Sequence, residues 1–120
     1  GVVSYANEVK DSVLGVPTEV LREHGAVSAQ TARAMAAGVR TRLGADVGIS
    51  VTGIAGPTGA TTGKPVGLVY IGVATPSEEN LRRDIWPGDR SEVRAASVQA
   101  ALQLALKTLT VTASNPKFAV

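Results

Sequence analysis

The stretch Tyr5-Ala6-Asn7-Glu8-Val9-Lys10 places a phenol and an amine near the start of a predicted helix. If Asn7 caps that helix, Lys10 falls in its first turn, where the helix dipole disfavours a cation. The same field would lower the pKa of Lys10 and favour the neutral amine, which can act as a general base toward a serine. Tyr5 could share this proton relay. The simpler alternative is an exposed lysine beside a half-buried tyrosine.

A glycine-rich loop at residues 51–57 (VTGIAGP) is the second candidate for chemistry. A predicted buried strand runs directly into it, and open α/β sheets bind ligands at such strand ends. Gly53 and Gly56 carry no side chain, so backbone N–H groups could approach an anion closely, and Thr52 adds a hydroxyl at the same edge. The alternative is a tight connection built from ordinary turn residues.

Two nucleotide-binding motifs are absent from the sequence. Residues 59–65 (GATTGKP) have one residue too few between their glycines for a P-loop, and proline stands where a magnesium-binding Ser or Thr belongs. No G-x-G-x-x-G is present either, which argues against a Rossmann-type dinucleotide site. Lys64 could reach a phosphate, but a solvated lysine is the simpler reading. Arg90 could also lie near a ligand phosphate, although Asp89-Arg90 is explained by a helix start alone.

Composition limits the remaining function classes. The chain has 120 residues, a formal net charge of +2 and no cysteine. One domain fits this length, and so weak a charge bias argues against nucleic acid or a membrane surface as partner. The lack of cysteine excludes disulfides and thiolate chemistry, and a single histidine, His24, cannot build a His-based metal site. We therefore expect no metal or cofactor, and a cytoplasmic location.

The periodicity of apolar residues predicts a layered α/β fold, three layers α/β/α with a mixed sheet. A helix beginning after Ser28 and a strand before the glycine-rich loop are the clearest elements. The long last helix carries apolar residues on two faces, so we expect it to be buried by the sheet and by another helix or subunit. The predicted strands are residues 1–4, 46–52, 67–74 and 80–86, the predicted helices are 7–14, 17–24, 29–43 and 89–109, and 111–120 is predicted to be a loose tail after a domain of residues 1–110.

Five sequence blocks in a fixed order resemble a known family. They are GVVSYANEVK with LGV, HGAVS, RLGADVGISVTGIAGPTG, KPVGLVYIGVA and GDR. This arrangement resembles the CinA C-terminal domain, a family that includes the stand-alone nicotinamide-nucleotide amidohydrolases. The resemblance covers nearly the whole chain, and TGIAGP followed by KPVGLVYIG is its most specific part.

The resemblance implies hydrolysis of nicotinamide mononucleotide, the small-molecule substrate, to nicotinate mononucleotide and ammonia. By the family's pattern a serine attacks the amide carbonyl, and a lysine with a nearby tyrosine activates it; Lys10 and Tyr5 match those positions. The pocket loop would bind the oxyanion or the phosphate through backbone N–H groups. The family pattern implies no cofactor, and we expect a homo-oligomer. The positions that match the pocket loop are Thr52, Gly53, Ile54, Ala55, Gly56 and Pro57.

One part of the family pattern is not in this sequence. The nucleophile belongs to an E-S-C-T-G-G-type segment, and Ser4, Ser12, Ser28 and Ser50 do not stand in that motif. The apolar first residues favour a piece of a longer protein over a shortened homologue without hydrolytic activity. Apolar surface left by such a segment could be covered by another chain. The alternatives are a non-catalytic module that binds a pyridine nucleotide or a protein, and a competence-associated scaffold.

Overall fold

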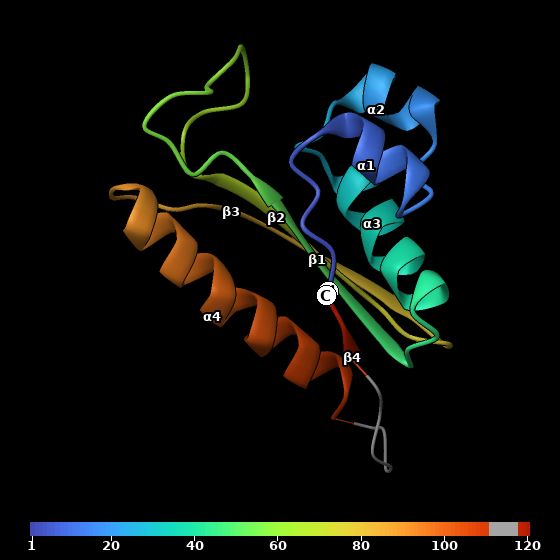
Figure 1. The fold of residues 1–120 in the computed structure, drawn as a ribbon. Coiled ribbons are helices and arrows are strands. Elements are labelled where there is room, and N and C mark those ends of the chain that lie inside the picture. The colour runs from blue at the N-terminus through green and yellow to red at the C-terminus, as the bar shows by residue number, and fades with distance from the viewer. Residues whose placement is uncertain (111–117) are drawn as a thin grey trace.

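The computed structural model describes residues 1–110 and 118–120, which form a four-stranded sheet between two layers of helices (Figure 1). The strand order is β3-β2-β1-β4. β1 to β3 form an antiparallel meander, whereas β4 runs parallel to β1, so the sheet is mixed as predicted. The elements are α1 (Asn7–Ser12), α2 (Thr18–His24), α3 (Ala29–Arg42), β1 (Val47–Gly53), β2 (Leu68–Ala74), β3 (Glu79–Ile85), α4 (Arg90–Thr108) and β4 (Phe118–Ala119).

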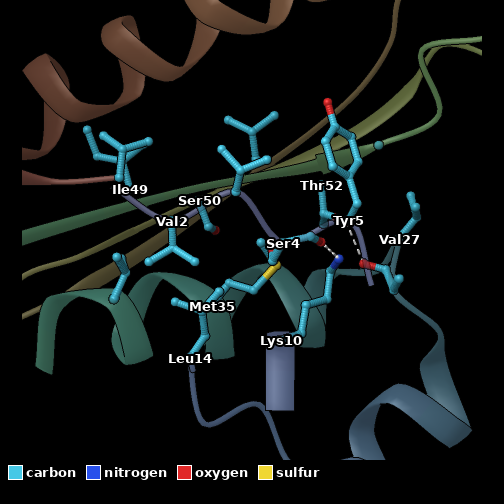
Figure 2. Close-up of a pocket in the computed structure, with 16 residues that line it drawn as sticks. Val2, Ser4, Tyr5, Lys10, Leu14, Val27, Met35, Ile49, Ser50 and Thr52 are labelled. Carbon is cyan, nitrogen blue, oxygen red and sulfur yellow. Dashed lines mark hydrogen bonds between the residues drawn. The ribbon is translucent and has the colours of Figure 1, made fainter. Parts of the chain in front are cut away.

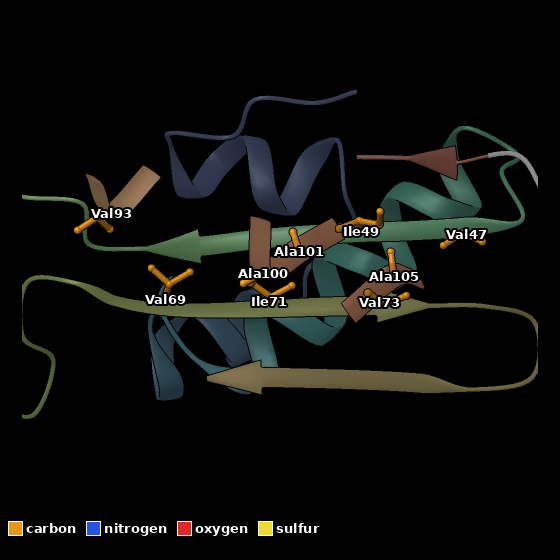
Figure 3. Close-up of a cluster of buried hydrophobic side chains, with 9 residues drawn as sticks. All are labelled: Val47, Ile49, Val69, Ile71, Val73, Val93, Ala100, Ala101 and Ala105. Atoms are coloured by element: carbon orange, nitrogen blue, oxygen red, sulfur yellow. The ribbon is translucent and has the colours of Figure 1, made fainter. Parts of the chain in front are cut away.

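The face of the sheet toward α4 is covered by an aliphatic core (Figure 3). Alternate residues of β1 and β2 point to this face because successive side chains of a strand project to opposite sides. Small alanines on α4 allow the helix to lie close to these branched side chains. This packing explains how a chain with only 3% aromatic residues builds a core. The buried residues of the cluster are Val47, Ile49, Val69, Ile71, Val73, Val93, Ala100, Ala101 and Ala105.

The opposite face of the sheet contacts the backbone of α3 almost directly. A Cβ built on Gly48 would lie 2.1 Å from the Ala36 carbonyl oxygen, and one on Gly72 would lie 2.7 Å from the Ala32 carbonyl oxygen. The buried Ser50 hydroxyl donates to that same Ala32 oxygen at 2.6 Å. Glycine is required at these two strand positions because any side chain would push the helix away from the sheet.

Local capping signals set the ends of the longer helices. The Ser28 hydroxyl accepts from the Thr31 amide at 3.1 Å at the start of α3, as predicted, and Gly44 follows its C-cap with a φ of +59°. At α4, Asp89 and Glu92 form a reciprocal capping box, which confirms Asp89 as the cap. The sequence signals therefore fix the entry of both helices that cover the sheet.

Three predictions for the amino-terminal part of the chain are wrong. Residues 1–4 form no strand; the Val2 amide donates to the Val120 carbonyl at 2.8 Å, so the two ends of the chain lie side by side. The N-cap of α1 is Ala6, and Asn7 is the first helical residue. Pro17 precedes α2 and is not inside its first turn. A strand needs a continuous ladder of hydrogen bonds, and β-prone composition in four residues does not provide one.

The predicted tail, residues 111–120, lies mostly outside the described residues. Its described part is not loose, because Phe118 and Ala119 form β4 beside Val47 and Gly48 of β1. On α4, the face toward the sheet is buried as predicted. The second predicted apolar face is only partly exposed: Val98 and Leu102 are 60% and 63% exposed, whereas Ala105 is buried. Cover of this face by another helix or subunit stays a prediction.

Candidate active site

Lys10 points into a cavity of about 390 Å³ at the end of β1 (Figure 2). The cavity lies among the amino-terminal segment, α1, α3 and β1, and its lining includes Ser50, Thr52 and Gly53. Lys10 is 6% exposed, and its Nζ donates a hydrogen bond to the Ser4 carbonyl oxygen. The structure thus brings the predicted lysine and the start of the predicted pocket loop together in one cavity.

Burial lowers the pKa of Lys10 below the ordinary value of 10.5, because desolvation disfavours the charged form. The direction agrees with the sequence prediction, but the cause differs. α1 has only six residues and Lys10 lies in its last turn, where a helix dipole would favour a cation. Removal of the amine from water, and not the helix dipole, therefore makes Lys10 a candidate proton acceptor.

The direction of Lys10 is set by the buried residues that follow α1. Leu14 and Val16 are 3% and 0% exposed, and both join a cluster with Met35 and Val39 of α3. The Val16 amide also donates to the Lys10 carbonyl at 2.9 Å. These contacts fix the end of the short helix against α3 and leave its lysine facing the cavity.

Thr52 and Gly53 form the floor of the cavity where β1 ends. The Thr52 hydroxyl donates to the Ala26 carbonyl at 2.6 Å, which ties the connection between α2 and α3 to the strand. A Cβ on Gly53 would lie 2.7 Å from Val69 Cγ2 and 2.8 Å from the Leu68 carbonyl oxygen. Gly53 is therefore needed for the tight exit of the strand, and the Thr52 hydroxyl is engaged in the fold as well as facing the cavity.

Tyr5 borders the same cavity, but its hydroxyl points away from the Lys10 amine (Figure 2). The residue is 88% exposed, so the alternative of a half-buried tyrosine is wrong. A hydrogen bond between Tyr5 and Lys10 is not among the contacts of the described residues. The proposed relay through Tyr5 stays a prediction that needs a rotation of the side chain.

A second cavity of about 520 Å³ lies on the other side of the β1 end. The loop after β1 and the first two turns of α4 line it, and the walls that it shares with the first cavity are Tyr5, Val51 and Gly53. The predicted pocket loop is therefore divided between two cavities. Thr52 faces the first, Gly53 borders both, Ile54, Ala55 and Gly56 face the second, and Pro57 lines neither.

Two arginines of α4 also line the second cavity, Arg90 and Arg94. Arg90 Nη1 donates to the Gly56 carbonyl at 3.2 Å, so it holds the loop against the helix start. Sequence reasoning considered Arg90 but not Arg94. Arg94 follows Arg90 by four residues, and this spacing places both side chains on one face of the helix. The spacing alone could therefore have pointed to Arg94.

The tip of the loop is attached to α2. Lys64 Nζ donates to the His24 carbonyl at 2.6 Å, at the carboxyl end of that helix. The reading of a simply solvated lysine is therefore wrong, and contact of Lys64 with a phosphate stays a prediction. A cation at this position is favourable because the last carbonyls of a helix carry partial negative charge.

Replacing Lys10 by methionine should flatten the pH dependence of stability. The folded-state pKa of Lys10 lies below 10.5. Between the lowered pKa of folded Lys10 and the value of 10.5 in the unfolded chain, Lys10 is protonated only in the unfolded chain. The free energy of unfolding therefore rises with pH across this interval, up to 10.5. Methionine carries no titrating group and should abolish this rise. Urea unfolding at a series of pH values measures it, and Lys107→Met, at an exposed lysine, is the control; an unchanged slope in Lys10→Met contradicts the interpretation.

The three-layer fold, the buried lysine and the glycine-rich strand end define a class of α/β domain with a candidate proton acceptor at the edge of its sheet. The chain belongs to the CinA family: the family model described as CinA C-terminal domain matches residues 1–109. The described residues contain no cluster of three or more His, Cys, Asp or Glu side chains that could hold a metal ion. No described helix is long and apolar enough to span a membrane.

Named relatives agree with this assignment. The chain is 51% identical over 105 residues to a putative competence-damage inducible protein of Desulforamulus reducens, and 54% identical over 114 residues to a CinA-like protein of Thermosynechococcus vestitus. These matches cover 88% and 92% of this chain but only 25% and 27% of the relatives. The chain thus spans about a quarter of the length of these relatives.

Solved structures show the same fold. The competence damage-inducible protein A of Klebsiella pneumoniae superposes with a TM-score of 0.88 at 34% identity, covering 94% of this chain and 70% of that one. The competence/damage inducible protein CihA of Agrobacterium tumefaciens gives 0.85 at 40% identity, covering 88% and 65%. The three-layer α/β/α arrangement is therefore that of CinA-superfamily proteins.

Proposed function

We propose that this domain provides the general base and the substrate pocket for hydrolysis of nicotinamide mononucleotide to nicotinate mononucleotide and ammonia. The observation that carries the proposal is the buried Lys10 amine in a cavity that ends at Thr52 and Gly53. Because burial lowers its pKa, the Lys10 amine is neutral and able to accept a proton at a lower pH than an exposed lysine. The family assignment supports this proposal, since its members include nicotinamide-nucleotide amidohydrolases by the resemblance described above.

The proposed reaction uses a serine that is not part of this sequence. Lys10 takes the proton of that serine while its oxygen attacks the carboxamide carbon, and the tetrahedral oxyanion accepts hydrogen bonds from backbone N–H groups of the glycine-rich loop. The C–N bond then breaks, and the proton on Lys10 passes to the leaving nitrogen as ammonia forms. Water then attacks the resulting ester. Lys10 takes a proton from that water and returns a proton to the serine oxygen as nicotinate mononucleotide leaves.

The test compares this chain with the same chain extended at Gly1 by the nucleophile-bearing segment of a relative. We expect ammonia release from nicotinamide mononucleotide only in the extended protein, because the sequence lacks the E-S-C-T-G-G-type motif. The matched control replaces the serine of that motif with alanine. Ammonia release by the chain alone would contradict the assignment of the nucleophile.

The same experiment separates the enzyme from a binding module. Calorimetric binding of nicotinamide mononucleotide by the extended protein without turnover would favour a module that holds a pyridine nucleotide. The amidase proposal requires both binding and ammonia release. A cofactor is not needed in either case, and a homo-oligomer in the cytoplasm, with no nucleic acid or membrane partner, remains our expectation for the intact protein.

A further inference from the structure

The outer side of α4 carries an uncharged apolar stripe. Val98, Leu102 and Leu106 follow one another at intervals of four residues, which places them on one side of the helix, and they are 60%, 63% and 71% exposed. Residues 95–106 contain no charged side chain. The exposed side of a helix in a soluble protein is normally rich in charged residues. A stripe of this kind indicates a surface that binds another protein surface.

Within the described part of the chain, α4 is the only helix on its face of the sheet. The other three helices, α1, α2 and α3, lie on the opposite side (Figure 1). The alanines of α4 that pack in the core, Ala100, Ala101 and Ala105, lie on the side toward the sheet. With 19 residues the helix is about 28 Å long. The stripe is therefore open to a second helix along its length.

One flank of the stripe is polar and has opposite charges at its two ends. Glu92, Gln99, Gln103 and Lys107 follow at spacings of seven, four and four residues, so they form one row beside the apolar residues. Glu92 uses one carboxylate oxygen to accept from the Asp89 amide at 3.1 Å in the capping box. Within the described residues its second oxygen and the Lys107 amine make no hydrogen bond or ion pair. Both charges are thus available to a partner.

We propose that this stripe binds the same stripe of a second copy of the chain, with the two α4 helices antiparallel about a twofold axis. In such a contact the same row of each copy lies side by side. Placing Val98 against Leu102 of the second copy sets the alignment. Glu92 lies six residues before Val98, and Lys107 lies five residues after Leu102, so Glu92 meets Lys107 of the second copy.

The charge pattern is what favours a second copy over an unrelated partner. The twofold axis repeats the pair of Glu92 and Lys107 at both ends of the contact, and the alignment of the apolar residues and that of the charges agree within one residue. The two glutamines of the row, Gln99 and Gln103, come close to each other across the same axis. The contact needs no substrate, so it does not depend on the proposed amidase activity.

Sedimentation equilibrium of the 120-residue chain measures this contact. We expect a dimer with a dissociation constant of about 10 μM, since one pair of helices buries less than the roughly 800 Å² per partner of a standard interface. Leu102→Glu puts a carboxylate into the apolar stripe and should weaken the dimer about a hundredfold. Arg83→Glu reverses an exposed charge on β3 and should leave the dimer unchanged. Thermal unfolding verifies that each variant is folded.

Charge reversal identifies the partner. Lys107→Glu and Glu92→Lys each place like charges at both ends of the contact, so each variant should dimerise about tenfold more weakly than native protein. An equimolar mixture of the two variants recreates both opposite-charge pairs and should associate as tightly as native protein, which a damaged helix start could not do. The proposal is overturned by a monomeric native chain, by native affinity in Leu102→Glu, or by a mixture that associates no better than either variant.

The same measurement on the extended protein tests whether the added segment covers the stripe. We expect the extended protein to form the same dimer and to lose it in Leu102→Glu. A monomeric extended protein would mean that the added segment occupies the stripe, and the second copy would be excluded as its partner. Ammonia release is compatible with either result, so the failure of one proposal does not decide the other.

Discussion

Lys10→Ala should lower kcat/KM for ammonia release by about 10³-fold in the extended protein, with little change in the affinity for nicotinamide mononucleotide. The proposed chemistry needs an amine that is neutral in the enzyme and close to the attacking oxygen. Lys10 meets both conditions: burial lowers its pKa, and it faces the cavity that ends at Thr52 and Gly53.

Two further variants distinguish a general base from a simple positive charge. Lys10→Arg keeps the charge but cannot release its proton, so it should be as inactive as alanine. Lys64→Ala removes a lysine whose amine binds the His24 carbonyl outside both cavities, and it should retain most activity. Full activity of Lys10→Arg would show that Lys10 acts as a fixed cation and would refute its role as the base.

The pH profile gives an independent measure of the same group. Lys10 is active as the neutral amine, so kcat/KM should rise with pH through the folded-state pKa of Lys10 and level off above it. Because burial lowers that pKa, the rise should be complete below the ordinary lysine value of 10.5. A profile that keeps rising through 10.5 would indicate a solvent-exposed amine and would contradict the buried geometry.

The parts of the fold that sequence predicted best are those governed by local rules. Ser28 and Asp89 start α3 and α4 because each side chain caps the backbone a few residues away, and such caps are legible in the sequence. Leu68–Ala74 form the inner strand β2 because a run of apolar and β-branched residues has few other stable conformations. The three-layer arrangement follows from the order of these elements.

The remaining features depend on contacts between distant residues. β4 consists of Phe118 and Ala119 alone, and two residues contain no periodicity that would place them beside β1. The lowered pKa of Lys10 was predicted in the right direction from the wrong cause, because burial is a tertiary property and the helix dipole was the local one available. Arg94 shares a cavity with the glycine-rich loop, 35 or more residues earlier, only through folding.

The close contact between α3 and the segment after α1 predicts a large loss of stability when a side chain is added there. Gly38→Ala should destabilise the protein by about 3 kcal/mol, because the new Cβ would lie 1.8 Å from the Leu14 carbonyl oxygen and 2.8 Å from its carbon. Helix propensity alone predicts the opposite sign, since alanine is favoured over glycine inside a helix by about 1 kcal/mol. The overlap is with backbone atoms, which cannot rotate away, so the steric cost should exceed the propensity gain.

Gly38→Ala should also impair the site, because Leu14 is held in the core directly after the helix that carries Lys10. Displacement of Leu14 would move α1 and turn the amine away from Thr52, so activity in the extended protein should fall even where the variant remains folded. Ala95→Gly, at an exposed position of α4, measures the propensity effect alone and should cost about 1 kcal/mol without loss of activity. Urea unfolding measures the change in stability, and ammonia release measures the change in activity. An increase in stability for Gly38→Ala would mean that α3 and the Leu14 segment are not in backbone contact. The positioning of Lys10 would then need another explanation.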